Sequence, residues 1–504
     1  MASLKKLAGQ TIWYGMSNIA AKLLNQLMTP LITYMLRRPK QMVDYGNFSM
    51  IMACVSMVNV LFTYGMETAY FRFSSTGSDQ KKLFQTTFTS LLVSTFILSA
   101  ILIFFRVPIS NFLELGTHSE YITWCVLIIA IDTMAAIPFA RLRQEERPRK
   151  YAFTRVAGIF VNIFFTSFFI VYSPAETARH PDTAYAIWYH GNTNVGFLLL
   201  ANLAQSFVTF MLLFKEWIVF RFRFDAALWK KLFIYSAPMV IIGLGGMVNE
   251  TMDRLMLPKL LPGSQDAGKT AVAIYAANYK IAIFITLFIT AFRMSAEPFF
   301  FSQAADKNAP KTYARVMKWF VIVLCNAFLF TALFIDLWKH YIPAEYRQNG
   351  GVGVVPILLA ANVALGIYYN LSVWYKITNK MYMGMIITLI GAVITLVLNF
   401  AFIPRFGMYA CAWATLAAYG SMMIISYFLG QRYFPVPYNT RKLLAYITVM
   451  LVLFFAEKLV MAITGIVAIR LISASVFMSL FLLLVINAEK KELRNMPVVG
   501  KWIK

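Results

Sequence analysis

Three ionisable residues lie close together toward the end of a long apolar segment, in the stretch GGMVNETMDRLML. Glu250 precedes Arg254 by four residues, the order that favours an ion pair on one helix face, and Asp253 adds a second carboxylate. Charged groups at membrane depth are costly unless they face protein or a water-filled cavity. A guanidinium in such a cavity is suited to bind phosphate or carboxylate oxygens. The stretch therefore predicts an anion-binding site, and a purely structural ion pair is the alternative interpretation.

The composition places these residues in an integral membrane protein. The chain has 504 residues, of which 60% are hydrophobic and only 13% are charged, whereas soluble proteins carry about 25% charged residues. Apolar runs of membrane-spanning length recur, which indicates helices and not a barrel. The four cysteines and four histidines show no metal-ligand or nucleophile spacing. We therefore expect no metal, no catalytic residues and no enzymatic activity.

Fourteen apolar segments are long enough to cross a bilayer. They run over about 8–36, 42–68, 83–105, 119–140, 152–173, 190–214, 232–257, 271–300, 314–337, 352–375, 382–403, 408–429, 443–463 and 466–487. Of the 46 Lys and Arg residues, 30 fall on the side of the N-terminus and 11 on the other side. This asymmetry predicts that both termini are cytoplasmic. It also explains most of the net charge of +24 without nucleic acid as a partner.

The two halves of the chain show weak internal similarity. With a shift of 230 residues, Tyr45 falls on Tyr275 and Glu67 on Glu297. Because the shift equals six spans, it predicts two six-helix lobes related by an axis along the membrane normal. We expect an N-lobe over residues 1–225, a C-lobe over 226–435, and two further helices with a cytoplasmic tail over 436–504. The predicted fold class is thus all-α, with two pseudo-symmetric lobes.

Polar side chains concentrate on single faces of the first, second, seventh and eighth spans. If these helices surround one cavity, the substrate would meet Lys22, Asn25, Gln26, Arg254, Lys280 and Arg293. The candidates for ion pairing or for coupling to an ion are Glu67, Glu250, Asp253 and Glu297. The expected cavity is polar and carries cations.

Four stretches resemble one transporter family. They are LNFAFIPRFGMYACAWATLAAY (398–419), YSAPMVIIGLGGMVNETMDRLML (235–257), AIYAANYKIA (273–282), and DYGNFS with YGMETAYFRF in the second span. The first is similar to the hallmark of spans 11 and 12 in the oligosaccharide/polysaccharide flippases, the O-antigen flippase-like branch of the MOP (multidrug/oligosaccharidyl-lipid/polysaccharide) exporter superfamily. Asn399, Pro404, Gly407 and Thr415 fit that pattern, whereas Ala410 stands where the family commonly has a second glycine.

The resemblance implies the fold of the multidrug (MATE) exporters and of the lipid II flippase, with alternating access. It also implies a function, the transfer of a polyprenyl-diphosphate-linked oligosaccharide across the bacterial inner membrane for cell-surface polysaccharide or lipopolysaccharide synthesis. The expected partners are this lipid-linked glycan, the bilayer and other glycan-assembly proteins, and the expected state is a monomer. No cofactor is expected beyond a coupling H⁺ or Na⁺. The alternatives are a cation-coupled multidrug exporter and a membrane glycan polymerase or ligase.

The sequence favours Glu67 over Glu297 as a candidate proton carrier. Burial in a low-dielectric wall favours the neutral acid. Arg293 stands one turn before Glu297 and would keep that carboxylate ionised, whereas the nearest basic residue on the helix of Glu67 is Arg72. A structural hydrogen-bonding role for Glu67 and coupling through Asp253 are the alternatives.

Overall fold

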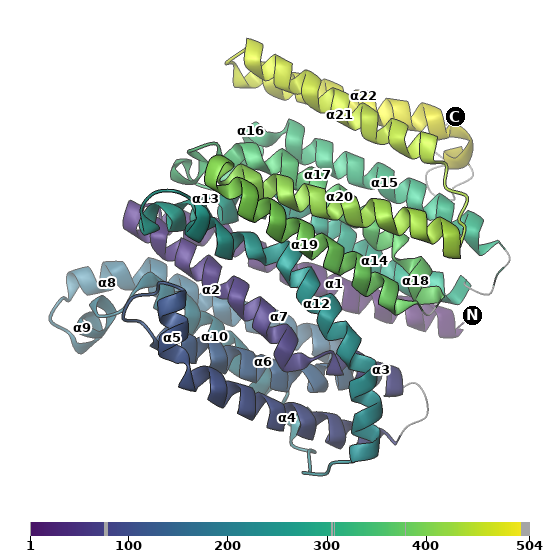
Figure 1. Ribbon diagram of the computed structural model, residues 1–504. Coiled ribbons are helices and arrows are strands. Elements are labelled where there is room, and N and C mark those ends of the chain that lie inside the picture. The colour runs from purple at the N-terminus through teal and green to yellow at the C-terminus, as the bar shows by residue number, and fades with distance from the viewer. Residues whose placement is uncertain (1, 75–78, 304–305, 307, 379, 495–504) are drawn as a thin grey trace. The chain divides into compact units, whose positions relative to one another are not determined.

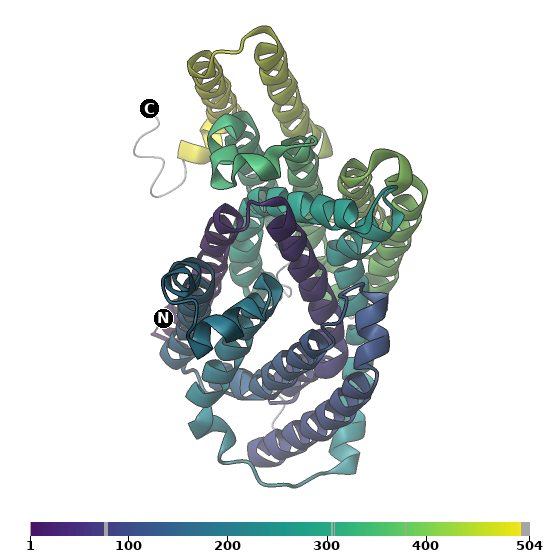
Figure 2. The same ribbon diagram turned by 90° about the vertical axis from the view of Figure 1, so that its left-hand side faces the viewer.

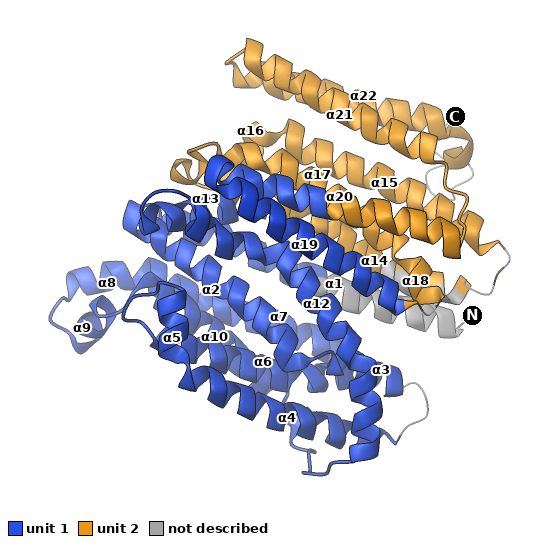
Figure 3. Ribbon diagram, viewed as in Figure 1, with its two compact units in different colours: residues 1–277, 381–418 blue, residues 278–380, 419–504 orange. Residues whose placement is uncertain are grey.

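The computed structural model describes residues 2–74, 79–303, 306, 308–378 and 380–494, without the side chains of residues 2–18, 295, 297, 298, 301 and 302. Every regular element in this part of the chain is a helix (Figure 1). The chain divides into two compact units, each built from separate segments (Figure 3). Unit 1 comprises residues 1–277 and 381–418, and unit 2 comprises residues 278–380 and 419–504.

Unit 1 contains the first seven spans and the eleventh. Its helices are α1 (Ala2–Met35), α2 (Pro39–Thr63), α3 (Met66–Ser74), α4 (Gln80–Phe104), α5 (Arg106–Phe112), α6 (Glu120–Gln144), α7 (Pro148–Ser167), a π-helical turn (Phe168–Tyr172), α8 (Ser173–Arg179), α9 (Ala184–His190), α10 (Asn194–Leu212), α11 (Phe214–Trp217), α12 (Ala226–Leu260), most of α13 (Gln265–Ala282), α19 (Met381–Phe406) and the start of α20 (Met408–Tyr433). Helix α6 packs against α2, α4 and α10, while α12 packs along α19 and α2. One core cluster joins Ile51 of α2, Cys125 of α6 and Leu199 of α10.

Unit 2 is built around one buried helix, α15. Its helices are the end of α13, α14 (Phe284–Gln303), α15 (Ala309–Leu333), α16 (Ile335–Trp338), three short 3-10 turns (Lys339–Tyr341, Ala344–Arg347 and Gly351–Gly353), α17 (Val354–Leu371), α18 (Val373–Ile377), the rest of α20, α21 (Thr440–Ile463) and α22 (Val467–Arg494). Helix α15 packs against α14, α17, α21 and α22. The last two helices form the hairpin at the top of Figure 2.

A three-residue ion-pair cluster holds the start of α22 in unit 2. The carboxylate of Asp336 on α16 lies 2.5 Å from the Lys339 ammonium and 3.3 Å from the Arg470 guanidinium. Burial of Asp336 opposes its ionisation, but the hydrogen bonds and charges of these two cations outweigh it and lower the pKa of Asp336. The carboxylate is therefore held ionised between α16 and α22.

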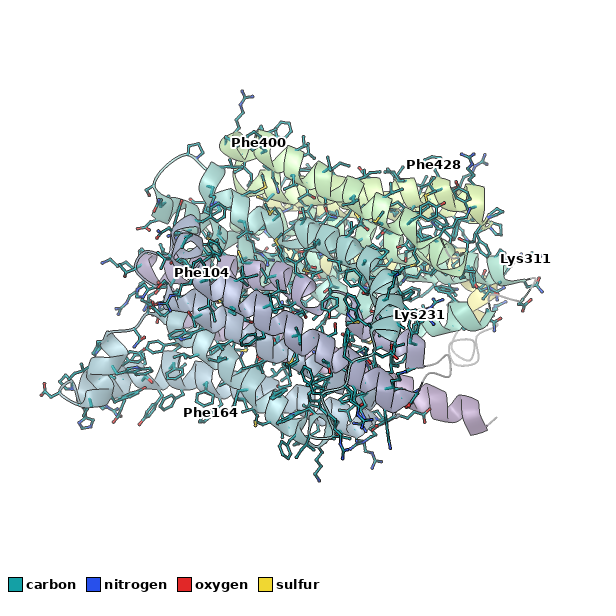
Figure 4. All side chains as sticks on the ribbon, turned by 60° about the horizontal axis from the view of Figure 1, so that its bottom comes forward. Phe104, Phe164, Lys231, Lys311, Phe400 and Phe428 are labelled. Atoms are coloured by element: carbon teal, nitrogen blue, oxygen red, sulfur yellow. The ribbon has the colours of Figure 1, made fainter. Side chains whose placement is uncertain are left out.

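The helices match the fourteen predicted spans one to one. In the described part of the chain, 12 helices are long and apolar enough to cross a membrane, or 13 with the bent pair α13–α14 counted as one span, whose halves meet at 50°. Helix α1, with 34 residues, is long enough to be the remaining span, although it carries a polar stripe. The aromatic rings of Phe104, Phe164 and Phe400 point outward from their helices in unit 1 (Figure 4), with exposed fractions of 81%, 63% and 70%. Such apolar exteriors suit a lipid environment.

Two glycines of the second span allow close packing against the seventh and eighth. A Cβ atom on Gly46 would clash with the backbone carbonyl of Lys269, so a larger residue would force the helices apart. Gly65 has φ +71° at the break between α2 and α3, and its Cα faces the backbone of Ser236 on α12. The glycine of DYGNFS thus allows α2 to approach α13 closely, and that of YGMETAYFRF places the break between α2 and α3 against α12.

Candidate functional site

In unit 1, the ionisable residues of α12 are divided between a buried face and an exposed one. Asp253 is buried, with 2% of its surface exposed, whereas Glu250 is exposed and Arg254 is half-buried. The Asp253 carboxylate accepts a hydrogen bond from the backbone N–H of Arg254 at 2.8 Å and lies close enough to its guanidinium for attraction. The phenol of Tyr45, on α2, is also within electrostatic reach of Arg254. Arg254 therefore stands at the boundary between the packed α2–α12 contact and a more open face.

Asn249 and Asp253, one turn apart on α12, form a cluster of buried polar side chains, and the contacts of Asn249 reach α19. The Thr395 hydroxyl donates to the side-chain oxygen of Asn249 at 2.8 Å, and the Asn249 amide donates to the Thr388 carbonyl at 3.4 Å. The Tyr275 hydroxyl lies close enough to interact with the Asp253 carboxyl. The cluster thus offers carboxylate, amide and hydroxyl oxygens away from water.

Two buried polar side chains of α12 and α19 carry atoms without a regular hydrogen bond. Asn399 of α19 is fully buried, and neither its amide nitrogen nor its amide oxygen has a hydrogen-bond partner among the described residues. One oxygen of Asp253 likewise makes no hydrogen bond of ordinary geometry there. Buried polar atoms are normally satisfied, and exceptions often mark an ion, a water or a functional role. No group of three or more His, Cys, Asp or Glu side chains in the described residues could hold a metal.

Glu67 has a cationic partner that lies far away in the sequence. Although Glu67 is part of the predicted second span, it lies on α3, beyond the helix break at Tyr64 and Gly65. Its carboxylate forms an ion pair with the Arg143 guanidinium of α6. Glu67 thus has a basic partner, as the sequence predicted for Glu297, but the partner comes from another helix.

The polar stripe of α1 has one buried member and two exposed ones. Gln26 is buried, with 4% of its surface exposed, while Lys22 and Asn25 are exposed. Helix α1 packs mainly against α7 of the same unit. Lys22 thus lies on an exposed part of the stripe, within the membrane-spanning part of the helix.

In unit 2, the predicted cations lie on both arms of the bent eighth span. Lys280 is half-buried on α13, two residues before the break. Arg293 is half-buried on α14, with its guanidinium carbon 4.1 Å from the ring centroid of Tyr369 on α17. This contact orients the guanidinium through a cation–π interaction. The side chain of Glu297 lies outside the description, so its pairing with Arg293 stays a prediction.

The polar contacts between α12 and α19 were only partly visible in the sequence. Asn399 fits the family motif, whereas Asn249 was not among the predicted site residues. A signal was available, because Thr388, Thr395 and Asn399 are spaced by seven and four residues and so share one face of α19. The described structure brings that face against α12.

The fold is shared with known transporters of small and lipid-linked molecules. The structure is similar to the lipid II flippase MurJ in an inward closed conformation, at 14% identity, over 95% of this chain and 99% of that one, with a TM-score of 0.67. It is also similar to a MATE transporter in the straight conformation, at 13% identity, over 85% and 95% of the two chains, with a TM-score of 0.59. A third similar structure is a mutant of the Vibrio cholerae MATE transporter VcmN, at 13% identity, over 86% and 98%, with a TM-score of 0.58.

At sequence level, the family model described as "Polysaccharide biosynthesis protein" matches residues 7–304, which is more than half of the chain. No curated protein matches the sequence significantly. The matched region contains every predicted cavity and coupling residue, from Lys22 to Glu297. The chain therefore has the fold of the MOP-superfamily transporters and belongs to the polysaccharide biosynthesis protein family.

Proposed function

We propose that the protein is a flippase that moves a polyprenyl-diphosphate-linked oligosaccharide across the bacterial inner membrane, from the cytoplasmic to the periplasmic leaflet. The observation that carries this proposal is the family match, which covers the spans with the membrane-embedded cations. MurJ, a lipid II flippase, has a similar fold. The termini would be cytoplasmic, as the distribution of Lys and Arg predicts.

The chemistry of such a substrate explains why cations are needed inside the membrane. A diphosphate carries about two negative charges and does not cross hydrocarbon unaided. Lys22 and Arg254 of unit 1 would offset that charge. The sequence predicts the same role for Lys280 and Arg293. Asn25 and Gln26 would add hydrogen bonds. Glu250 and Asp253 would keep Arg254 hydrated and oriented when no substrate is bound.

Transport can be measured in proteoliposomes that contain a short-chain polyprenyl-diphosphate oligosaccharide with a fluorescent sugar. A membrane-impermeant quencher reports the fraction of label on each side. The proposal expects protein-dependent equilibration of the label between the leaflets. No acceleration over empty liposomes would contradict it.

A cation-coupled multidrug exporter is the second candidate, because the MATE transporters have a similar fold. The same proteoliposomes, loaded with a cationic dye, distinguish the two functions. A flippase leaves dye efflux at the background rate, whereas an exporter accelerates it under an ion gradient. The four predicted cavity cations favour an anionic substrate.

For coupling, we propose that Asp253 and its neighbours bind the driving H⁺ or Na⁺. Asp253 is buried one helical turn from Asn249, close to the Tyr275 hydroxyl, and such oxygen groups suit a proton or a small hard cation. Glu67 is less suited, because its carboxylate already forms an ion pair with Arg143. Asp253→Asn should remove the dependence of transport on an imposed pH or Na⁺ gradient, and Glu67→Gln should keep it. The reverse pattern would assign coupling to Glu67.

A further inference from the structure

The loop between α11 and α12 begins with a turn, continues without regular secondary structure, and is tied down at both ends. We call residues 218–225, IVFRFRFD, the strap (Figure 1). Just before it, the buried carboxylate of Glu216 lies 2.9 Å from the Arg147 guanidinium and 2.6 Å from the Lys150 ammonium. At its other end, Asp225 forms an ion pair with Lys82 of α4.

Further hydrogen bonds fix the backbone of the strap along α4. The Thr89 hydroxyl donates to the carbonyl of Arg223 at 3.2 Å, and the backbone N–H of Asp225 donates to the Thr86 hydroxyl at 3.3 Å. Asp225 also caps α12 by accepting from the backbone N–H of Leu228 at 2.8 Å. The main chain of the strap is thus held in place by specific contacts within unit 1.

The phenylalanines of the strap differ in exposure. Phe220 is partly buried and packs against Phe88, with ring centroids 4.7 Å apart and the rings tilted by 51°. Phe222 is 68% exposed and Phe224 is 49% exposed, at the point where α4 begins, α6 ends and α12 begins. Aromatic residues at the ends of spans are typical of the membrane–water boundary. Both arginines of the strap line a pocket, together with Val219, Phe224 and Asp225.

This pocket has a volume of about 1010 Å³ and an excess of positive charge. Two of its five cations are paired, Lys82 with Asp225, and Arg141 with Glu145 at 2.6 Å. Its remaining carboxylate, that of Asp79, accepts hydrogen bonds from backbone N–H groups at the start of α4.

The other three cations of the pocket are Lys81, Arg221 and Arg223. All three are exposed, and no carboxylate in the described part of the chain forms an ion pair with them. An anion that binds to these three cations would therefore break no existing ion pair. The flexible side chains of three cations on two fixed backbone segments can surround one phosphate.

We infer that this pocket binds the phosphate headgroup of an anionic phospholipid, with Lys81, Arg221 and Arg223 as its ligands and the strap phenylalanines against the acyl chains. The mixture of unpaired cations and exposed aromatic rings at the ends of three spans fits an amphiphilic phosphate better than a soluble anion. The site lies within one compact unit and does not depend on the proposed transport function, so either proposal can fail alone.

The test is native mass spectrometry of the purified full-length protein titrated with phosphatidylglycerol or phosphatidylcholine. The test variant carries Lys81→Gln, Arg221→Gln and Arg223→Gln. A matched control removes three exposed lysines near the same ends of the spans but outside the pocket: Lys215→Gln, Lys230→Gln and Lys231→Gln. Melting temperatures in neutral detergent check that both variants are folded.

Phosphatidylglycerol should bind the wild type in preference to phosphatidylcholine, and the pocket variant should bind it about tenfold more weakly, since each basic residue near the headgroups contributes to attraction. The control variant should bind as the wild type does. Equal losses in both variants, or no preference for phosphatidylglycerol, would overturn the inference. Displacement of the lipid by inorganic phosphate or by farnesyl diphosphate would also overturn it, because the pocket would then be a site for soluble phosphate or for the prenyl diphosphate substrate.

Discussion

Replacement of Glu489 by glutamine should loosen the attachment of α22 within unit 2. Glu489 has 3% of its surface exposed, and its carboxylate lies 2.6 Å from the Lys318 ammonium of α15 and 2.5 Å from the Lys442 ammonium of α21. The Tyr446 hydroxyl donates to the same carboxylate at 2.6 Å. One buried carboxylate therefore joins three helices of this unit.

The size of the effect follows from what Glu489→Gln leaves behind. Removing one partner of a buried ion pair costs about 3–5 kcal/mol, because the other charge stays buried without compensation. Lys318 retains a second carboxylate, that of Glu492 at 2.7 Å, and the side chain of Lys442 is 34% exposed. We therefore expect the lower part of that range or less, about 2–3 kcal/mol.

Thermal unfolding of the detergent-purified protein and limited proteolysis of the last hairpin would measure this loss. Glu492→Gln is the matched control: its side chain is 38% exposed, so it should cost less than about 1 kcal/mol. Lys318→Ala combined with Glu489→Gln should cost less than the sum of the two single changes, because both disrupt the same pair. Equal destabilisation by Glu489→Gln and Glu492→Gln, or strict additivity in the double variant, would refute the reasoning.

Three further predictions follow from the fold. Gly46→Ala should lower the melting temperature, at a cost of about 1–3 kcal/mol, because the added methyl group pushes α2 away from the Lys269 carbonyl. Gly246→Ala should be tolerated, because nothing lies within 4 Å of the added atom. Equal effects of the two changes would contradict the packing argument. A cysteine at Arg149 should react with an impermeant thiol reagent only from the cytoplasm and one at Glu345 only from the periplasm, in a background without the native cysteines, and labelling of both from one side would contradict the topology. Because the pKa of Asp336 is lowered in the folded protein, its ion pairs should contribute fully to stability at a pH above the ordinary value of 3.8. That contribution should be lost as the pH falls through the folded-state pKa, so the difference in unfolding temperature between wild type and Asp336→Asn should shrink in acid. A difference that grows in acid would contradict this prediction.

Much of the fold could be predicted from the sequence, since hydropathy and helical length act locally. Each predicted apolar segment corresponds to a helix of suitable position. The breaks inside spans were harder to predict. The second span ends at Tyr64 and Gly65, both at positive φ, and the eighth bends by 50° between α13 and α14. These breaks depend on packing against other helices, which one apolar run does not reveal.

The candidate site could be predicted only where its members share a helix. The stripe on α1 and the acidic and basic residues of α12 follow from spacing alone. The ion pair between Glu67 and Arg143 joins residues on different helices, and neither position carries a local signal for the other. The buried neighbours of Asn249 on α19 were missed for the same reason. Residue spacing along each helix therefore identifies its polar face. The tertiary structure is needed to show which of these faces are in contact.

The most direct test of the cationic cavity is the leaflet-equilibration rate of the labelled lipid-linked oligosaccharide in proteoliposomes containing Lys22→Ala, Arg254→Ala or Lys22→Arg. Since charge-assisted contacts to phosphate are worth more than neutral ones, each alanine variant should slow translocation by about tenfold or more at normal expression and folding. Lys22→Arg, which keeps the charge, should retain more of the wild-type rate than Lys22→Ala. Wild-type rates in both alanine variants would contradict the account.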